Sequence, residues 1–224
     1  FHKVSFQYQD GIQALRGMEL HVTPGQKVCI MGESGAGKST ILRLLTGAFT
    51  NFEGSVLVDD VPIANYNLTS LRANTGILLS QQDIFHGTLY ENITMGNKSI
   101  QLKDITELAE QCGLVNFIQS QPKGFDTELD PTGKRLPSKI RQDILLMRAL
   151  LGKRRLLLLE EPFQHMEMPY QQRIMDYLNA DREATVLITT EDAAIAKACD
   201  LVLYVENGAI TFQGSWQQWQ EKNR

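Results

Sequence analysis

The first part of the chain alternates apolar and polar residues, and this pattern predicts extended strands. A two-residue period near the N-terminus indicates two antiparallel strands joined by a turn, and a continuous apolar run after them indicates a buried strand. Two more strand patterns follow, separated by an acidic turn. The predicted strands are Phe1–Tyr8, Met18–Val22, Lys27–Met31, Ser55–Val58 and Asn74–Ser80, with turns at residues 9–11 and 59–60.

The middle of the chain has helical periodicity, and the last third alternates strands with helices. The expected helices of the middle part are Thr88–Ile93, Leu102–Cys112, Leu114–Gln119 and Ser138–Leu151. After them the pattern predicts strands at Arg155–Glu160, Ala184–Thr189, Leu201–Val205 and Ala209–Phe212, and helices at Tyr170–Asn179, Asp192–Ala198 and from Ser215 onward. This order predicts an α/β fold with a mainly parallel core, a β-rich N-terminal edge and a helical insertion.

Composition says more about the class of protein and its environment than about its function. The chain has 224 residues, 42% of them hydrophobic, and a formal net charge of −4, so no basic excess suggests nucleic acid as a partner. The three cysteines are far apart and indicate reduced thiols. No apolar run reaches the roughly 18–20 residues that span a bilayer. The chain starts at Phe1 inside a predicted strand, so we expect it to be a piece of a longer protein.

The segment Gly32-Glu-Ser-Gly-Ala-Gly-Lys-Ser-Thr40 carries the clearest chemistry. It fits the phosphate-loop pattern G-x-x-x-x-G-K-[ST] between a predicted strand and a predicted helix, where backbone N–H groups and the helix N-terminus bind phosphate oxygens. We therefore expect a nucleoside triphosphate, with Lys38 at its β- and γ-phosphates and Ser39 on Mg²⁺. The expected phosphate-binding residues are Gly32, Ser34, Gly35, Ala36, Gly37, Lys38, Ser39 and Thr40.

A second motif is a pair of acidic residues that follows the apolar run Leu156–Leu159. Glu160 and Glu161 follow a predicted parallel strand, so they are expected at the carboxyl edge of the sheet, where α/β proteins bind ligands. In this interpretation Glu160 holds Mg²⁺ through water, and Glu161 is the general base that polarises the attacking water.

The order of these motifs resembles that of the nucleotide-binding domain of ATP-binding cassette (ABC) transporters, over nearly the whole chain. By this resemblance Tyr8 stacks on adenine, and Gln81 is the glutamine that senses Mg²⁺ and touches the membrane domain, with Gln82 as a second candidate. Further similar segments are Gly87–Ile93, which is typical of exporters, Leu136–Asp143 at the signature position, Glu167 in the D-loop, Glu191 at the switch position and Glu206–Gly208.

The resemblance implies a P-loop NTPase fold of the ABC ATPase type and an ATP-dependent export function. Residues 1–80 and 152–224 are expected to form the core and β subdomain, and about 81–151 the α-helical subdomain, of one domain. The implied ligands are ATP and Mg²⁺. The implied partners are a second nucleotide-binding domain, identical or a sibling, and a transmembrane domain N-terminal to residue 1, at the cytoplasmic face of an inner or plasma membrane.

Three departures from the family pattern make the rate of hydrolysis an open question. The signature reads Leu136-Pro-Ser-Lys-Ile-Arg-Gln142 and lacks both glycines, so Lys139 either replaces lost phosphate donors or is a solvated helix residue. Glu191 stands where the family has histidine, and an ionised carboxylate 4 Å from a phosphate charge costs about 4 kcal/mol at an effective dielectric of 20. One hypothesis pairs Glu191 with Lys139 of the partner domain. Glu160 replaces the family's aspartate and is longer by one methylene.

Three other functions compete with transport. A nucleotide-binding module that does not hydrolyse ATP is favoured by the altered signature and switch, and opposed by the intact Glu161. A soluble ABC protein of DNA repair or translation would need a coiled-coil insertion or a second cassette, which these residues lack. A small-molecule kinase would need an acceptor pocket and a lid.

Overall fold

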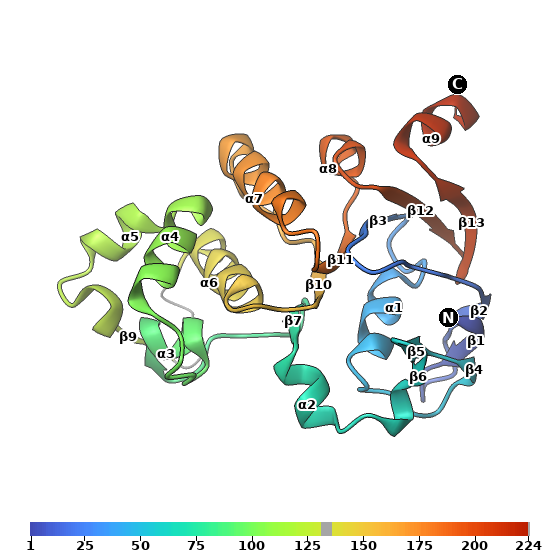
Figure 1. Ribbon diagram of the computed structural model, residues 1–224, viewed down its shortest axis with the longest axis horizontal. Coiled ribbons are helices and arrows are strands. Elements are labelled where there is room, and N and C mark those ends of the chain that lie inside the picture. Colours follow the sequence, from blue (N-terminus) through green and yellow to red (C-terminus); the bar gives the residue numbers. More distant parts are fainter. Residues whose placement is uncertain (131–135, 224) are drawn as a thin grey trace.

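A mixed six-stranded sheet runs through the middle of the molecule in the computed structural model, which describes residues 1–130 and 136–223 (Figure 1). Its strand order is β13-β12-β3-β11-β10-β7, and all neighbouring pairs are parallel except β12 and β13. The strands are β3 (Lys27–Met31), β7 (Thr75–Leu78), β10 (Leu156–Glu160), β11 (Thr185–Thr189), β12 (Leu201–Glu206) and β13 (Ala209–Gly214). The predicted mainly parallel α/β core is confirmed.

Both faces of this sheet are buried, because successive side chains of a strand point to opposite sides. In β10, Leu157 and Leu159 pack into one hydrophobic cluster and Leu158 into another. The first cluster lies against α6 (Ser138–Leu150) and α7 (Met168–Ala180). The second lies against α1 (Lys38–Leu45), which sits between the central sheet and the N-terminal strands (Figure 1).

The N-terminal sheet has the order β2-β1-β4 and is antiparallel. Its strands are β1 (His2–Gln7), β2 (Gln13–Met18) and β4 (Glu53–Ser55). The turn at residues 9–11 is confirmed, but the predicted strand Met18–Val22 is wrong, because β2 ends at Met18. Two register shifts between β1 and β2 break the two-residue period, so the alternation of apolar residues no longer marks the strand.

The predicted single strand Ser55–Val58 is also wrong, because it is divided between two pairings. Ser55 ends β4 and pairs with β1, whereas β5 (Leu57–Val58) forms a hairpin with β6 (Val61–Pro62), and Val56 between them is buried. Helix α2 (Leu68–Ala73) was not predicted from the sequence. Its N-cap Asn67 accepts a hydrogen bond from the backbone N–H of Ser70.

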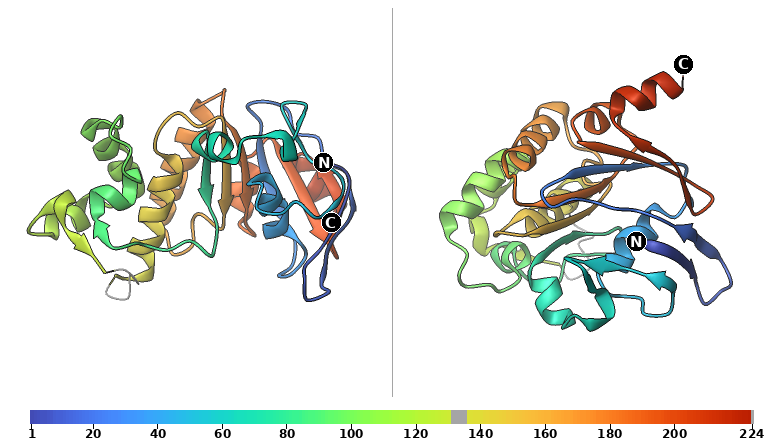
Figure 2. Two further views of the ribbon diagram at one scale, coloured as in Figure 1. Left: turned by 90° about the horizontal axis from the view of Figure 1, so that it is seen from below. Right: turned by 45° about the vertical axis from the view of Figure 1, so that its right-hand side comes forward.

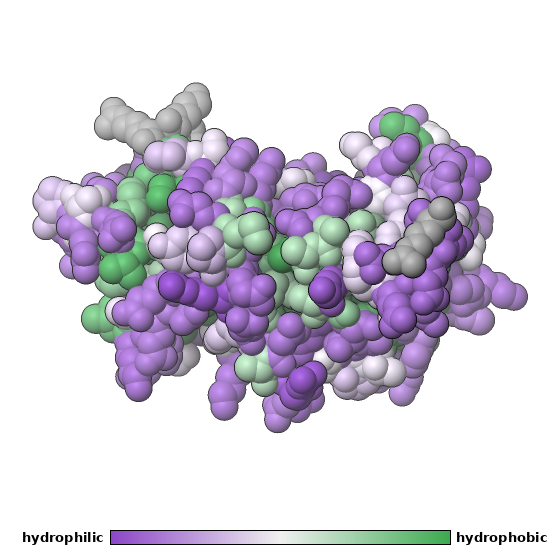
Figure 3. Space-filling model, turned by 90° about the horizontal axis from the view of Figure 1, so that it is seen from above, coloured by the Kyte–Doolittle hydropathy of each residue, from purple (hydrophilic) through white to green (hydrophobic). Residues whose placement is uncertain are grey.

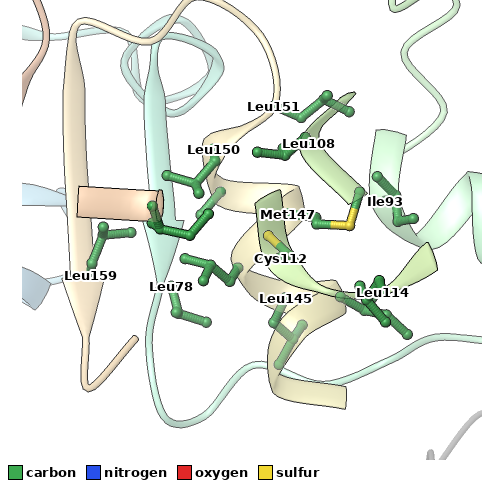
Figure 4. Close-up of a cluster of buried hydrophobic side chains, with 14 of the residues drawn as sticks. Leu78, Ile93, Leu108, Cys112, Leu114, Leu145, Met147, Leu150, Leu151 and Leu159 are labelled. Atoms are coloured by element: carbon green, nitrogen blue, oxygen red, sulfur yellow. The ribbon is translucent and has the colours of Figure 1, made fainter. Parts of the chain in front are cut away.

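The helical part lies at one end of the molecule and packs on the sheet through α6 (Figure 2). Figure 4 shows its core, in which side chains of α3, α4 and α6 meet Leu78 of β7 and Leu159 of β10. The remaining elements are α3 (Leu89–Thr94), α4 (Leu102–Cys112), α5 (Val115–Ser120), α8 (Ala193–Lys197), α9 (Trp216–Lys222), the short strands β8 (Gly87–Thr88) and β9 (Glu128–Leu129), and the 3₁₀ turns Ile63–Asn65 and Gly124–Asp126. The four predicted helices of this part are confirmed, and the subdomain boundaries stay a prediction.

On the face shown in Figure 3, polar side chains predominate and apolar areas are scattered between them. Within the described residues, none of the helices is both long and apolar enough to span a bilayer.

Lys27, at the start of β3, is fully buried, and its side chain is held by backbone carbonyls. Its ammonium donates hydrogen bonds to the carbonyl oxygens of Gly25, Asp181 and Ala184, and thereby fastens β3 to the connection between α7 and β11. Burial lowers the pKa of Lys27, and the charges of Asp181 and Asp200 oppose this shift.

Replacing Lys27 with methionine is expected to reduce the free energy of unfolding by about 3 kcal/mol, because three carbonyls lose their donor and that of Ala184 is buried. Pulse proteolysis in urea measures this loss as a lower midpoint. Lys98→Met, at an exposed lysine, is the control and should leave the midpoint unchanged. Equal midpoints for the two variants would contradict the role given to Lys27.

Candidate functional site

The carboxyl ends of four neighbouring parallel strands bring the predicted site residues to one edge of the sheet. Gly32 follows β3, Glu160 ends β10, Glu191 lies two residues beyond β11, and Ser80 lies two residues beyond β7. They border a cleft of about 880 Å³. Its lining residues are Tyr8, Asp10, Ile12, Ala14, Gly32–Thr40, Arg43, Ser80, Glu160, Glu161, Thr189, Glu191 and Tyr204. All the expected phosphate-binding residues lie in this cleft.

The phosphate loop depends on glycine at both of its ends. Gly32 has a φ of 137° and Gly37 a φ of 110°, in the region that side chains with a Cβ rarely adopt. A Cβ on Gly32 would also collide with the carbonyl oxygen of Val205, and one on Gly37 with that of Ala14. The loop therefore curls into the N-terminus of α1, which begins at Lys38. The backbone N–H groups of a loop that curls in this way can bind an anion.

The Lys38 side chain folds back over this loop. Its ammonium donates to the carbonyl oxygens of Gly32 and Glu33 and forms an ion pair with Glu191, at 3.0 Å from Oε1. The same Oε1 accepts a hydrogen bond of 3.2 Å from the backbone N–H of Gly32. The structure thus pairs Glu191 with Lys38 of its own chain. The predicted pairing of Glu191 with Lys139 of a partner domain stays a prediction.

Glu160 connects the phosphate loop to the segment after β7. Its Oε1 accepts a hydrogen bond of 2.5 Å from the Ser39 hydroxyl, and its Oε2 one of 2.8 Å from the backbone N–H of Ser80. The longer side chain thus reaches the Ser39 hydroxyl directly. Ser80 was missed by the sequence analysis, because no local pattern marks a backbone donor.

Glu161 has an unusual backbone conformation for a residue with a side chain, with a φ of 43°. Its N–H bonds to the carbonyl oxygen and hydroxyl of Thr189, at 3.1 and 3.2 Å, and its carbonyl oxygen accepts a hydrogen bond of 3.1 Å from Gln142 of α6. Burial raises the pKa of Glu161, Lys38 opposes this, and Glu191 and Glu160 add to it. Such a carboxylate at the end of a strand can act as a general base.

Tyr8 also lines the cleft. Its hydroxyl is 2.9 Å from the hydroxyl of Thr40, and its ring makes edge contacts with Phe6 and Phe49. The structure therefore places the predicted adenine-stacking residue beside the phosphate loop. Its stacking role stays a prediction.

The structure does not bring Gln81 into the cleft. Gln81 is exposed, and within the described part of the chain its side chain has no hydrogen-bond partner. The amide of Gln82 accepts a hydrogen bond of 3.1 Å from the N–H of Leu79 and so closes the turn after β7. Of the two candidates, Gln81 is therefore the one whose side chain is available to bind a ligand. Its role in Mg²⁺ binding stays a prediction.

Lys139 lies outside the cleft, on the first turn of α6. It forms an ion pair of 2.8 Å with Asp143, whose side chain is 0% exposed, and its ammonium lies 5.9 Å from the centre of the Tyr170 ring. Burial raises the pKa of Asp143, and Lys139 opposes this shift. The ion pair between Lys139 and Asp143 was not predicted, although a lysine and an aspartate four residues apart on a helix are a known pairing signal.

Replacing Lys139 with methionine is expected to destabilise α6 locally by about 3 kcal/mol, because a buried carboxylate loses its partner. Hydrogen exchange read by mass spectrometry on the α6 amides measures this effect. The control is Lys103→Met, which removes an exposed ion pair with the same spacing to Glu107 and should change protection on α4 by less than about 0.5 kcal/mol. Unchanged exchange in α6 would show that Asp143 needs no partner.

Comparison with known proteins decides the family. The sequence profile of the family described as "ABC transporter" matches residues 15–164, which is more than half of the chain. The chain belongs to the ABC transporter family. The expected ABC ATPase fold and the resemblance to exporters are confirmed, and this family is one of ATP-binding ATPases.

Similar proteins include several exporters of the family. An ATP-dependent lipid A-core flippase of Idiomarina loihiensis is 33% identical over 97% of this chain and 38% of its own length. Antigen peptide transporter 1 of Rattus norvegicus is 31% identical over 99% of this chain and 31% of its own length. The solved structure of a bacterial Atm1-family ABC exporter with ATP bound has 29% identity and a TM-score of 0.92, over 100% of this chain and 39% of that one. This ABC chain thus spans less than two fifths of each of these relatives.

Proposed function

We propose that this chain is the ATP-binding domain of an exporter, in which binding and hydrolysis of ATP drive a substrate across a membrane. The similar flippases and exporters support this function. The observation that carries it is the meeting of the phosphate loop with Glu160 and Glu161 in one cleft, through the hydrogen bond from Ser39 to Glu160.

Several residues of the cleft have a proposed part in the reaction. Lys38 and the N–H groups of the loop bind phosphate, Tyr8 contacts the base, and Glu161 takes the proton of the attacking water. The raised pKa of Glu161 suits a base that must hold this proton briefly.

Mg²⁺ fits the donor set at the same place. The Ser39 hydroxyl and the Glu160 carboxylate meet at 2.5 Å and offer the oxygen ligands that Mg²⁺ prefers. The described residues contain no group of three or more His, Cys, Asp or Glu that could hold a metal alone, so phosphate oxygens and water would complete the ligands. When bound, Mg²⁺ neutralises phosphate charge.

The proposed partners are a second nucleotide-binding domain and a transmembrane domain, at the cytoplasmic face of the membrane. In such a dimer the Pro137–Ile140 segment of one domain faces the nucleotide of the other. Lys139 is held by the buried Asp143 and would have to leave it to reach a phosphate.

We propose slow turnover, because Glu191 holds Lys38 and the signature segment lacks its glycines. The same two observations favour the second candidate function, a nucleotide-gated regulatory half of a heterodimer that does not hydrolyse ATP.

The decisive experiment measures ATP hydrolysis by the full-length protein in lipid, with and without chelation of Mg²⁺, beside equilibrium binding of ATP. Turnover that needs Mg²⁺ supports the ATPase. Binding with background hydrolysis supports the regulatory half, and a protein that binds no nucleotide contradicts both functions.

A further inference from the structure

Glu191 places a carboxylate at the phosphate loop of its own chain. Its Oε1 lies 3.0 Å from the Lys38 ammonium and 3.2 Å from the backbone nitrogen of Gly32. A lysine ammonium and an inward-pointing N–H are the two kinds of donor that a phosphate loop offers to phosphate oxygens. The carboxylate therefore occupies donors that a bound nucleotide would use.

Hydrogen bonds hold the backbone on both sides of Glu191, so the fold places this residue beside Gly32. Before it, the N–H of Thr190 bonds to the carbonyl oxygen of Ile30 at 3.3 Å, which ties the chain to β3. After it, Asp192 caps α8 by accepting a hydrogen bond of 2.7 Å from the N–H of Ala194. Glu191 thus sits between a strand end and a capped helix, beside Gly32.

The charges around the cleft make each added phosphate group harder to accommodate. Among its lining residues, all of which lie in the described part of the chain, five are acidic and two are basic. They are Asp10, Glu33, Glu160, Glu161 and Glu191 against Lys38 and Arg43. A triphosphate must draw Lys38 away from Glu191 and also bring its terminal charge close to that carboxylate. A diphosphate also needs Lys38 for its β-phosphate, but it brings no third phosphate charge toward the Glu191 carboxylate.

We propose that Glu191 makes this site select nucleoside diphosphates over triphosphates, by competing with the γ-phosphate for Lys38. This inference rests on the proposed function, because it takes the cleft as a nucleotide site. The Glu191 side chain is 56% exposed, so it can swing into solvent and the preference is limited to about tenfold. At equal concentrations of the two nucleotides, the site would then hold mostly the diphosphate.

The test compares two competitors at this one site. The full-length protein is photolabelled with azido-ADP, and labelling of the peptide that carries Tyr8 is followed, so that a second site on a partner chain does not contribute. Mg²⁺ with ADP, or with the β,γ-imido analogue of ATP, competes at a fixed free Mg²⁺ concentration. The ratio of the two half-inhibiting concentrations is measured in the wild type, in Glu191→Gln and in Asp10→Asn.

In the wild type we expect ADP to compete at about a tenfold lower concentration than the triphosphate analogue. Glu191→Gln keeps an acceptor for the N–H of Gly32 but loses the charge, and the ratio should fall to near one. Asp10→Asn removes a different charge from the same cleft and should lower the ratio much less than Glu191→Gln does.

Equal competition by the two nucleotides in the wild type, or a ratio that Glu191→Gln does not move, overturns the inference while the nucleotide site stands. A ratio that falls equally in Asp10→Asn overturns it as well, because general charge would then explain the effect. Labelling that neither nucleotide displaces, in any of the three proteins, contradicts the proposed function itself.

Discussion

Replacing Glu161 with glutamine is expected to lower steady-state ATP hydrolysis by the full-length protein about a hundredfold or more, because the amide cannot accept the proton of the attacking water. The change keeps the size of the side chain and leaves the backbone contacts of Glu161 with Thr189 and Gln142 in place. Nucleotide binding should persist, since the variant removes one of several negative charges from the cleft. Phosphate release from the protein in lipid, beside equilibrium binding of ATP, measures both quantities.

The control for this experiment is Glu206→Gln, which makes the same chemical change at the exposed last residue of β12, outside the cleft. It should leave hydrolysis unchanged. Hydrolysis that survives in Glu161→Gln at the wild-type rate would exclude Glu161 as the base. A wild-type rate already at background, with tight binding of ATP, would favour the regulatory half of a heterodimer.

Replacing Lys38 with alanine should weaken nucleotide binding at this site by about a hundredfold, which corresponds to about 2.8 kcal/mol. The variant removes the ammonium that the fold aims at the phosphate loop and also leaves Glu191 without its cation. Both effects act in the same direction, because an unpaired carboxylate repels phosphate. Photolabelling of the Tyr8 peptide with an azido-ATP probe at increasing concentrations gives the change in Kd.

Lys153→Ala is the control for lost positive charge, because Lys153 is exposed and lies outside the cleft. The double variant Lys38→Ala with Glu191→Gln separates the two contributions. If repulsion by Glu191 matters, the double variant binds more tightly than Lys38→Ala alone. Wild-type binding in Lys38→Ala would mean that the nucleotide does not use this loop.

Most of the fold could be predicted, because the central strands are buried on both faces and carry continuous apolar runs. Leu156–Leu159 and Lys27–Met31 were found in this way, and the phosphate loop and the acidic pair after them followed from motif spacing. The errors in strand prediction lie near the N-terminus. Register shifts between β1 and β2 and the division of residues 55–58 between two pairings are decided by partner strands, which a local pattern does not contain.

The sequence by itself determined which chemical groups the cleft contains: a phosphate loop with Lys38 and Ser39, two acids at the end of a strand, and a glutamate at the switch position. These follow from residue type and spacing along the chain. Only the tertiary structure decided which of these groups meet. Glu191 pairs with Lys38 because β11 and β3 are neighbours in the sheet, and Lys139 is held because α6 buries Asp143. Such pairings depend on distances in space between residues far apart in the chain, and on burial, which sets the cost of leaving a charge alone.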